Sequence, residues 1–118
     1  MIRGRINAQG EPFVPLVVHG SRARRIEVVL DTGFTGHLCL SRRHRRAMHL
    51  APVGEVETEL ADGNRILQRV YLGGITFAGE RRRVFVTLTK SKESLVGTAL
   101  LLNRQVRLDF RTRRVSVT

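Results

Sequence analysis

The sequence predicts a compact, mainly β domain with two short helices, and three observations support this. The chain has 118 residues, enough for one hydrophobic core but not for two lobes with a cleft between them. Its apolar residues fall in short, β-branched runs separated by Gly, Pro, Asn, Asp and Ser, a pattern typical of strands and tight turns. No linker-like stretch or shift in composition divides the chain. We therefore expect a single domain over residues 1–118.

The first predicted elements form a hairpin. Residues 13–18 and 26–30 are both β-rich, and His19-Gly20-Ser21 supplies the turn between them. Pro15 has no N–H to donate, so we expect the first strand to lie at a sheet edge or to pair irregularly there. Residues 37–40 follow as another short strand.

A helix and a long hairpin are expected next. Ser41 is a good N-cap for a short helix over residues 42–48. Apolar or Thr side chains then alternate with Glu over residues 55–60, which predicts a half-exposed strand. Asp62-Gly63 is a strong hairpin signal, and residues 66–72 supply the returning strand. Both strands have a polar face, so we expect this hairpin to project from the domain.

The C-terminal part repeats this strand and helix pattern. Gly73-Gly74 is expected to turn the chain into residues 75–77, and residues 84–88 are apolar enough for a central strand. A short helix is expected over residues 98–103, with Thr98 as its cap. Residues 106–110 and 115–117 are the last strands. The apolar run and Gly turn at 28–33 return in shorter form at 94–98, which suggests a half-domain duplication or a chance match.

The charge of the chain is strongly positive and carried by arginine. The formal net charge is +11, and all of the 21 basic residues except Lys90 and Lys92 are Arg. Aromatic residues make up 5% and Trp is absent, so few rings are available to stack on the bases of a single strand. We therefore interpret the arginines mainly as a solvated surface and expect a nucleic-acid partner to be unlikely. The clusters are Arg42, Arg43, Arg45 and Arg46; Arg81 to Arg83; and Arg111, Arg113 and Arg114.

Several classes of protein are disfavoured by what the sequence lacks. No apolar run approaches the roughly 18 residues of a membrane span, and the arginine-bearing start does not resemble a signal peptide. We therefore expect a cytoplasmic protein without a membrane partner. Cys39 is the single cysteine, so neither an intrachain disulfide nor a cysteine cluster for zinc can form. We expect no metal and no cofactor.

Asp31 is the most informative residue for chemistry. It directly follows three apolar residues, Val28-Val29-Leu30, where a buried ionised carboxylate would be costly. Thr32 and Gly33 can turn the backbone and aim amide donors at that carboxylate. Two interpretations stay open at this point: Asp31 is a functional carboxylate at the end of a buried strand, or it opens an ordinary turn.

A family resemblance enters here. The segment from Val28 to Gly36, with Asp31-Thr32-Gly33 at its centre, resembles the active-site segment of the retropepsin-like (retroviral-type) aspartic proteases. Leu95-Val96-Gly97, leading into Thr98-Ala99-Leu100-Leu101, is similar to the second signature of that family. Asp62-Gly63 lies between the two, where the family has its flap hairpin. The three features occur in the family's order over nearly the whole chain.

The resemblance implies a closed β fold and an aspartic endopeptidase that acts on polypeptides as a homodimer. Each chain would supply one Asp31, and the two carboxylates would activate a water molecule without a metal or covalent intermediate. Thr32 would hydrogen-bond across the dimer axis, Gly33 would let the substrate backbone approach, and Thr35 would orient Asp31. The flap residues would be Ala61, Asp62, Gly63 and Asn64.

The sequence departs from the family at two positions. Phe34 stands where retroviral members usually have a small residue, and the flap tip has one glycine where viral flaps have more. An alternative function is therefore a catalytically silent dimerisation or protein-interaction module of the same fold. A basic nucleic-acid-binding β domain is a weaker alternative.

Other polar residues are weaker candidates. His37 and Cys39 share a strand face but lack further partners for a metal or a nucleophile and base pair. His44 and His49 are five residues apart, off the spacing at which a helix presents two ligands to one ion. We expect Asp109 to be an ordinary strand residue, with an arginine partner as the alternative.

Overall fold

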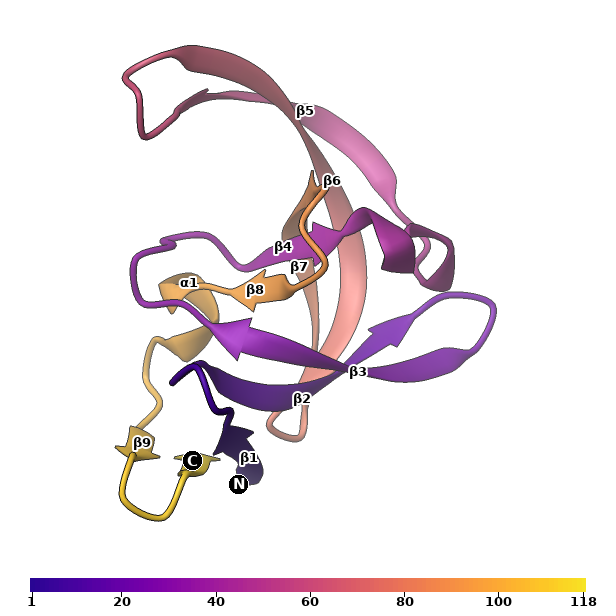
Figure 1. The fold of residues 1–118 in the computed structure, drawn as a ribbon. Coiled ribbons are helices and arrows are strands. Elements are labelled where there is room, and N and C mark those ends of the chain that lie inside the picture. The colour runs from indigo at the N-terminus through magenta and orange to yellow at the C-terminus, as the bar shows by residue number, and fades with distance from the viewer.

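The computed structural model describes residues 1–118 and consists of ten strands, one 3₁₀ helix and one short α-helix (Figure 1). In chain order the elements are β1 (Ile2–Ile6), β2 (Pro12–His19), β3 (Ala23–Leu30), β4 (Leu38–Ser41), η1 (Arg42–Ala47), β5 (Ala51–Glu59), β6 (Arg65–Phe77), β7 (Glu80–Thr89), β8 (Ser94–Val96), α1 (Thr98–Leu101), β9 (Val106–Asp109) and β10 (Arg114–Val117).

Six of the strands close into a barrel. The order β6-β7-β4-β8-β3-β2 is joined at its ends by a pairing of β2 with β6, at Val17 opposite Thr76 and Val18 opposite Ile75. β5 extends the sheet beyond β6, and β1, β10 and β9 follow β2 on the other side. Closure gives each of the six barrel strands a partner on both sides, and β5 and β9 are the edge strands that remain. The predicted mainly β, closed structure is confirmed.

The barrel interior is the hydrophobic core. Nineteen buried residues form one cluster, and Val14, Val28, Leu38, Val86 and Leu100 in it are fully inaccessible to solvent. Alternate residues of each strand point inward, which explains the period-two pattern of burial along β2 and β7. The core thus holds β3, β4 and β8 in fixed positions beneath the loop that carries Asp31.

The strand pairings have an internal two-fold repeat. Exchanging β2, β3, β4 and η1 with β6, β7, β8 and α1 converts every pairing of the barrel into another of the same direction. The parallel pair of β3 with β8 exchanges with the parallel pair of β4 with β7, and the β2–β3 hairpin with the β6–β7 hairpin. A half-domain repeat is therefore present in the topology, but it relates β3 to β7 and β4 to β8, so the similar segments at 28–33 and 94–98 are not its equivalent positions.

Pro15 lies in β2, a strand that has partners on both sides. Toward β3 it lies opposite Glu27. On its other side β2 pairs with β1 only up to Phe13 and with β6 only from Val17. Pro15 therefore stands in the gap between two partners. The expected irregular pairing is confirmed, and the alternative of a sheet edge is wrong.

Gly73 and Gly74 do not form a turn, contrary to prediction. They lie within β6, which is continuous over thirteen residues, and the turn occurs instead at Ala78 and Gly79, both with positive φ. A Cβ on Gly73 would come within 2.7 Å of the Met48 side chain. The glycine is needed for close packing of η1 against the sheet.

Both predicted helices form, but they are shorter or tighter than expected. Residues 42–47 are a 3₁₀ helix, and the Ser41 side chain donates to the Ser91 carbonyl at 2.6 Å in place of capping it. α1 ends at Leu101, and its N-cap is Gly97 and not Thr98. In both cases a tertiary contact determines the helix start.

Three other outcomes concern the strands. The β5–β6 hairpin forms around Asp62 and Gly63 as predicted, with Gly63 at φ +87°, and it projects from the barrel (Figure 1). β1 is a strand that the sequence did not indicate. Asp109 ends β9, and its carboxylate accepts the N–H groups of Arg111 and Thr112. These hydrogen bonds hold the pKa of Asp109 below its ordinary value.

We predict that Leu38→Ala lowers the free energy of unfolding by about 2–5 kcal/mol, because it empties a fully buried position beside β8. Leu67→Ala is the matched control: its side chain is 73% exposed on the projecting hairpin, and we expect a change within about 0.5 kcal/mol. Chemical denaturation measures both. Equal effects would contradict the assigned core.

Candidate active site

Asp31 lies where β3 leaves the barrel. Its N–H donates to the carbonyl of Val96 at 2.9 Å, which continues the parallel pairing of β3 with β8 by one residue. Its carboxylate Oδ1 accepts the N–H of Gly33 at 2.9 Å. The carboxylate is thus oriented by the loop that follows it, and the side chain is half-buried.

Backbone hydrogen bonds join this loop to the second signature. Thr98 N–H donates to Phe34 O at 2.8 Å, Gly97 N–H to His37 O at 3.0 Å, and Ala99 N–H to Gly36 O at 3.3 Å. Together with the bond from Asp31 to Val96, they connect residues 31–37 to residues 96–99. The two sequence motifs that suggested the family resemblance are therefore in direct contact.

Thr32, Gly33 and Thr35 surround Asp31 on the open side of the loop, and all three are exposed in the single chain. A Cβ on Gly33 would lie 3.2 Å from Asp31 Oδ1, so the absence of a side chain keeps the carboxylate accessible. The proposed bonds of Thr32 across a dimer axis and of Thr35 to the outer oxygen of Asp31 stay predictions.

Phe34, the bulky departure from the family pattern, packs against two glycines. A Cβ on Gly36 would come within 2.7 Å of the ring atoms Cζ and Cε1, and one on Gly97 would meet the ring at Cδ2 as well as the Phe34 carbonyl. The ring is half-buried in this position. Gly36 therefore provides room that a small residue at 34 would not need, while Gly97 makes room for both the ring and the neighbouring backbone.

A cleft of about 800 Å³ lies between the loop and the β5–β6 hairpin. The hairpin rises from the barrel and curls over the side that carries the loop and α1 (Figure 1). Its inner wall is mainly apolar or neutral: Gln68 spans from Thr58 to the carbonyl of Leu88 at the barrel, and Val70 is buried below it. The lining residues are Phe34 to Leu38, Val53 to Glu59, Gln68, Val70, Phe85, Thr87 and Ala99.

The cleft lining and the predicted site overlap only in part. Thr35 belongs to both. Asp31 lies three residues before Phe34, where the lining begins. The hairpin tip, Ala61 to Asn64, lies beyond Glu59, the last lining residue of β5. Most of the lining, including Phe85, was not predicted from the sequence. The signal in the sequence is strand alternation: with Val84 and Val86 pointing to the core, Phe85 must point outward, and it is 54% exposed.

His37 lies in the wall of the cleft, whereas Cys39, two residues further along the chain, is not among the lining residues. The His37 ring lies 5.9 Å from the Phe85 ring; burial, reinforced by the nearby positive charge of Arg82, lowers its pKa. Burial raises the pKa of the Cys39 thiol against an opposing hydrogen bond with Thr87, so the thiolate is disfavoured. This pair does not have the properties of an activated nucleophile and base.

Two further observations describe the chain as a whole. No cluster of three or more His, Cys, Asp or Glu side chains suited to a metal ion occurs in the structure. None of its helices has the length and apolar character needed to cross a membrane.

A closed barrel with a half-buried aspartate in a braced Asp-Thr-Gly loop defines the class of the fold. The chain is similar to the EIAV protease solved with the inhibitor HBY-793, with a TM-score of 0.63, 15% identity, and coverage of 80% of this chain and 88% of that one. It is also similar to the simian foamy virus (mac) protease, with a TM-score of 0.58, 15% identity, and coverage of 75% and 90%.

No protein-family model and no curated relative matches the chain. The likeness to the two viral proteases, at this low identity, establishes the fold alone. The chain thus has the retropepsin-like fold that the sequence predicted, and its activity is the subject of the proposal below.

We predict that Gly36→Ala is destabilising by about 1–3 kcal/mol, because the new methyl group overlaps the Phe34 ring. In the double variant Phe34→Ala/Gly36→Ala the overlap is absent, so a double-mutant cycle gives a coupling energy of about 0.5–3 kcal/mol. Gly54→Ala is the control, since nothing lies within 4 Å of its Cβ, and its coupling to Phe34→Ala is expected to be close to zero. Denaturant titration of the variants decides.

A second prediction concerns the pH dependence of stability. The lowered pKa of His37 means that the folded chain binds this proton less tightly than the unfolded chain. Above the unfolded pKa of about 6.5 both forms are neutral; as the pH falls below that value, the unfolded state takes up the proton first and stability decreases. We expect His37→Gln to reduce the loss of Tm between pH 7 and pH 5. An NMR titration of His37 giving a pKa above the ordinary value would contradict this.

Proposed function

We propose that this protein is an aspartic endopeptidase that hydrolyses peptide bonds as a homodimer. The observation that carries the proposal is the position of Asp31, whose carboxylate is oriented by Gly33 N–H and whose loop is joined by backbone hydrogen bonds to residues 96–99. Such bracing holds a reactive group within the small tolerance that catalysis requires. The likeness in fold to two viral proteases supports the same assignment.

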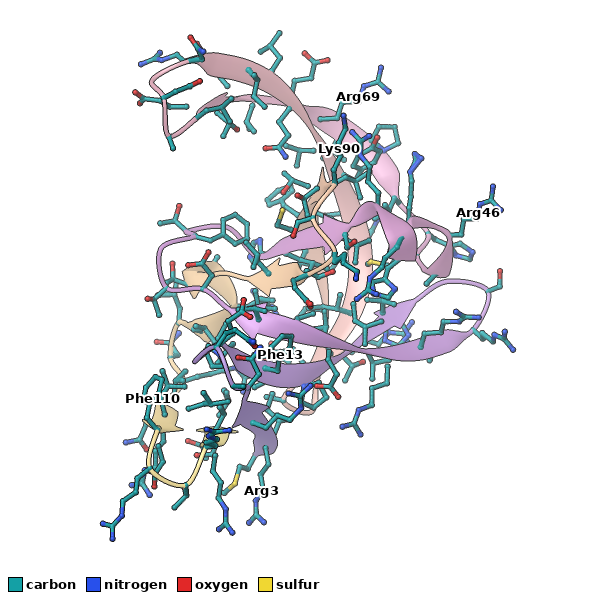
Figure 2. The ribbon with its side chains drawn as sticks, viewed as in Figure 1. Arg3, Phe13, Arg46, Arg69, Lys90 and Phe110 are labelled. Carbon is teal, nitrogen blue, oxygen red and sulfur yellow. The ribbon has the colours of Figure 1, made fainter.

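A single chain provides half of such a site. It has one Asp-Thr-Gly, and the exposed Thr32 and Gly33 leave the carboxylate side of the loop open. Exposed apolar side chains are available for association: Leu102, Leu108 and Phe110 are 70%, 39% and 59% exposed, and Phe110 lies at the end of β9 (Figure 2). We infer that a second copy covers this side and brings its own Asp31 beside the first.

The chemistry then needs one acid and one base. Two carboxylates at close range resist double ionisation, so the pair shares a proton, as aspartic proteases in general do. The ionised Asp31 takes a proton from a water molecule held between the two, and that water attacks the peptide carbonyl carbon. The protonated Asp31 donates its proton to the carbonyl oxygen. Collapse of the resulting gem-diol breaks the C–N bond, and the leaving nitrogen takes up a proton.

The β5–β6 hairpin is proposed to act as the flap. β5 is exposed over nearly its whole length, and β6 is exposed in its first part, residues 65–69 except Gln68. The tip is held by local bonds, with Leu60 N–H donating to Asn64 O and Gly63 N–H to Leu60 O. A hairpin with few buried contacts can move as a unit. Closure over a bound peptide would exclude water from the Asp31 pair.

We predict that Asp31→Asn lowers the rate of peptide cleavage by at least about 100-fold, because the amide can act neither as general base nor as general acid. The readout is cleavage of a peptide library by the purified chain. Asp109→Asn is the matched control, since the amide oxygen can still accept the Arg111 and Thr112 N–H groups. Equal cleavage by wild type and Asp31→Asn would overturn the catalytic assignment. If the chain forms dimers but cleaves no peptide of the library, the catalytically silent interaction module becomes the assigned function.

The shared site is tested separately by mixing. Adding an equal amount of Asp31→Asn to a fixed amount of wild type leaves one quarter of the dimers with two aspartates, so the measured activity should fall to about half by mass action. An unchanged activity would show that each chain cleaves alone and would overturn the dimeric mechanism.

A further inference from the structure

Four arginines from two separate segments line a hollow of about 290 Å³ at the β2–β3 turn and η1. Its lining residues are Ser21, Arg22, Arg24, Arg43, His44, Arg46 and Ala47. We call this site the arginine hollow. All four arginines are exposed, and no acidic side chain is among the lining residues.

The local backbone explains why these arginines converge. In a 3₁₀ helix side chains three residues apart lie above one another, which places Arg43 and Arg46 on the same face of η1. On the other segment, Arg22 lies in the β2–β3 turn and Arg24 is the second residue of β3, and both line the hollow. The end of β2 and the segment after η1 are joined by a hydrogen bond from His49 N–H to His19 O at 3.1 Å, and a Cβ on Gly20 of the turn would overlap the carbonyl oxygen of Ala47 at the end of η1. Backbone contacts therefore hold the two walls of the hollow together.

The arginines of the hollow are not neutralised within the chain. The ion pairs of the structure involve only Arg25, Arg65, Arg82 and Arg104. Burial lowers the pKa of His44, and the charges of Arg43 and Arg24 lower it further, although Glu93 opposes them. Four like charges held close together repel one another and attract a polyanion.

A second basic hollow, of about 780 Å³, lies next to the first. Its lining includes Gly20 and Met48, the chain neighbours of Ser21 and Ala47 in the arginine hollow, and three consecutive arginines, Arg81 to Arg83. The two hollows are thus separated only by the contact between the β2–β3 turn and the end of η1. A ligand that extends along this face meets positive charge on both sides of the contact.

We propose that the arginine hollow binds the phosphate backbone of a double-stranded nucleic acid without regard to base sequence. Guanidinium groups donate paired hydrogen bonds that fit phosphate oxygens. Regularly spaced phosphates supply several negative charges along one line, as two neighbouring basic hollows require. The low aromatic content, which made a nucleic-acid partner unlikely from the sequence, disfavours single strands but not the backbone of a duplex.

The surroundings favour a duplex over other polyanions. The hot spots of protein interfaces combine arginine with buried aromatic anchors, and none of the large exposed apolar side chains of the chain lies on η1 or the β2–β3 turn. Single-strand binding needs rings on which bases stack, but Arg45 covers the nearby Tyr71 ring at 5.6 Å. Phosphate contacts alone remain as the mode of recognition.

Binding at this face would leave the proposed active site free. The arginine hollow and its neighbour share no lining residue with the cleft beside Asp31. Phe110 belongs to the face assigned to the second copy, and Arg46 lies on a different side of the molecule (Figure 2). The proposal is therefore independent of proteolysis, and either can fail without the other.

The test is fluorescence anisotropy of a labelled 20-base-pair duplex titrated with the full chain at several salt concentrations. About four phosphate contacts would weaken binding by about 100-fold between 50 and 200 mM salt. In R22Q/R24Q/R43Q/R46Q the slope of log K against log salt should be smaller by about 3–4. DNA and RNA duplexes form the two arms that distinguish the source of the phosphates.

The control variant R3Q/R107Q/R111Q/R114Q removes the same charge from exposed positions on β1, β9, the β9–β10 turn and β10 and should retain most of the slope. An equal loss in both variants would overturn the assigned site, as would the absence of duplex binding at 50 mM salt. Tighter binding of a single strand, or of polyglutamate of equal charge, would overturn the choice of ligand. The single charge reversal Arg43→Glu repeats the test if the quadruple variant does not fold.

Discussion

The arrangement of the whole molecule depends on the insertion of β8 between β3 and β4. β8 runs parallel to β3 and antiparallel to β4, so the loop between those two strands must pass over the end of β8. There its backbone bonds to residues 96–99. Each such bond contributes only about 0.5–1.5 kcal/mol net, but four of them over seven residues leave the Asp31 loop little freedom. A rigid loop on a closed barrel is what a precisely placed carboxylate requires.

Close packing at this crossing also explains why a bulky residue is tolerated beside the aspartate. The Phe34 ring occupies space left by the missing side chains of Gly36 and Gly97. Gly97 has a second constraint, because a Cβ there would also overlap the Gly36 and Phe34 carbonyl oxygens. The glycine of the second signature is therefore required by the crossing itself, whereas Gly36 is required only by the ring. The departure at Phe34 and the glycine two residues later are one packing solution.

The positive charge has two different structural settings. Arg82 and Arg104 form ion pairs with Glu80, and Arg104 also lies 5.7 Å from the Phe77 ring, so these side chains belong to the folded surface of the barrel. The four arginines of the arginine hollow, Arg22, Arg24, Arg43 and Arg46, have no such partners. Repulsion among these positive charges lowers the stability of the fold, and backbone contacts hold the segments that carry them. This arrangement points to a binding role. The arginine-rich composition is thus divided between structural and unpaired groups.

The sequence alone determined the fold class, most strands and the candidate carboxylate, because these follow from local pattern: β-branched runs, Asp62-Gly63 at the hairpin, and Asp31 after Val28-Val29-Leu30. It did not determine features that depend on distant residues. Gly73-Gly74 reads locally as a turn, but packing against Met48 makes it part of a strand. The cleft wall at Phe85 and the convergence of Arg22 and Arg24 with Arg43 and Arg46 required the tertiary structure, since only the closed barrel brings these segments together.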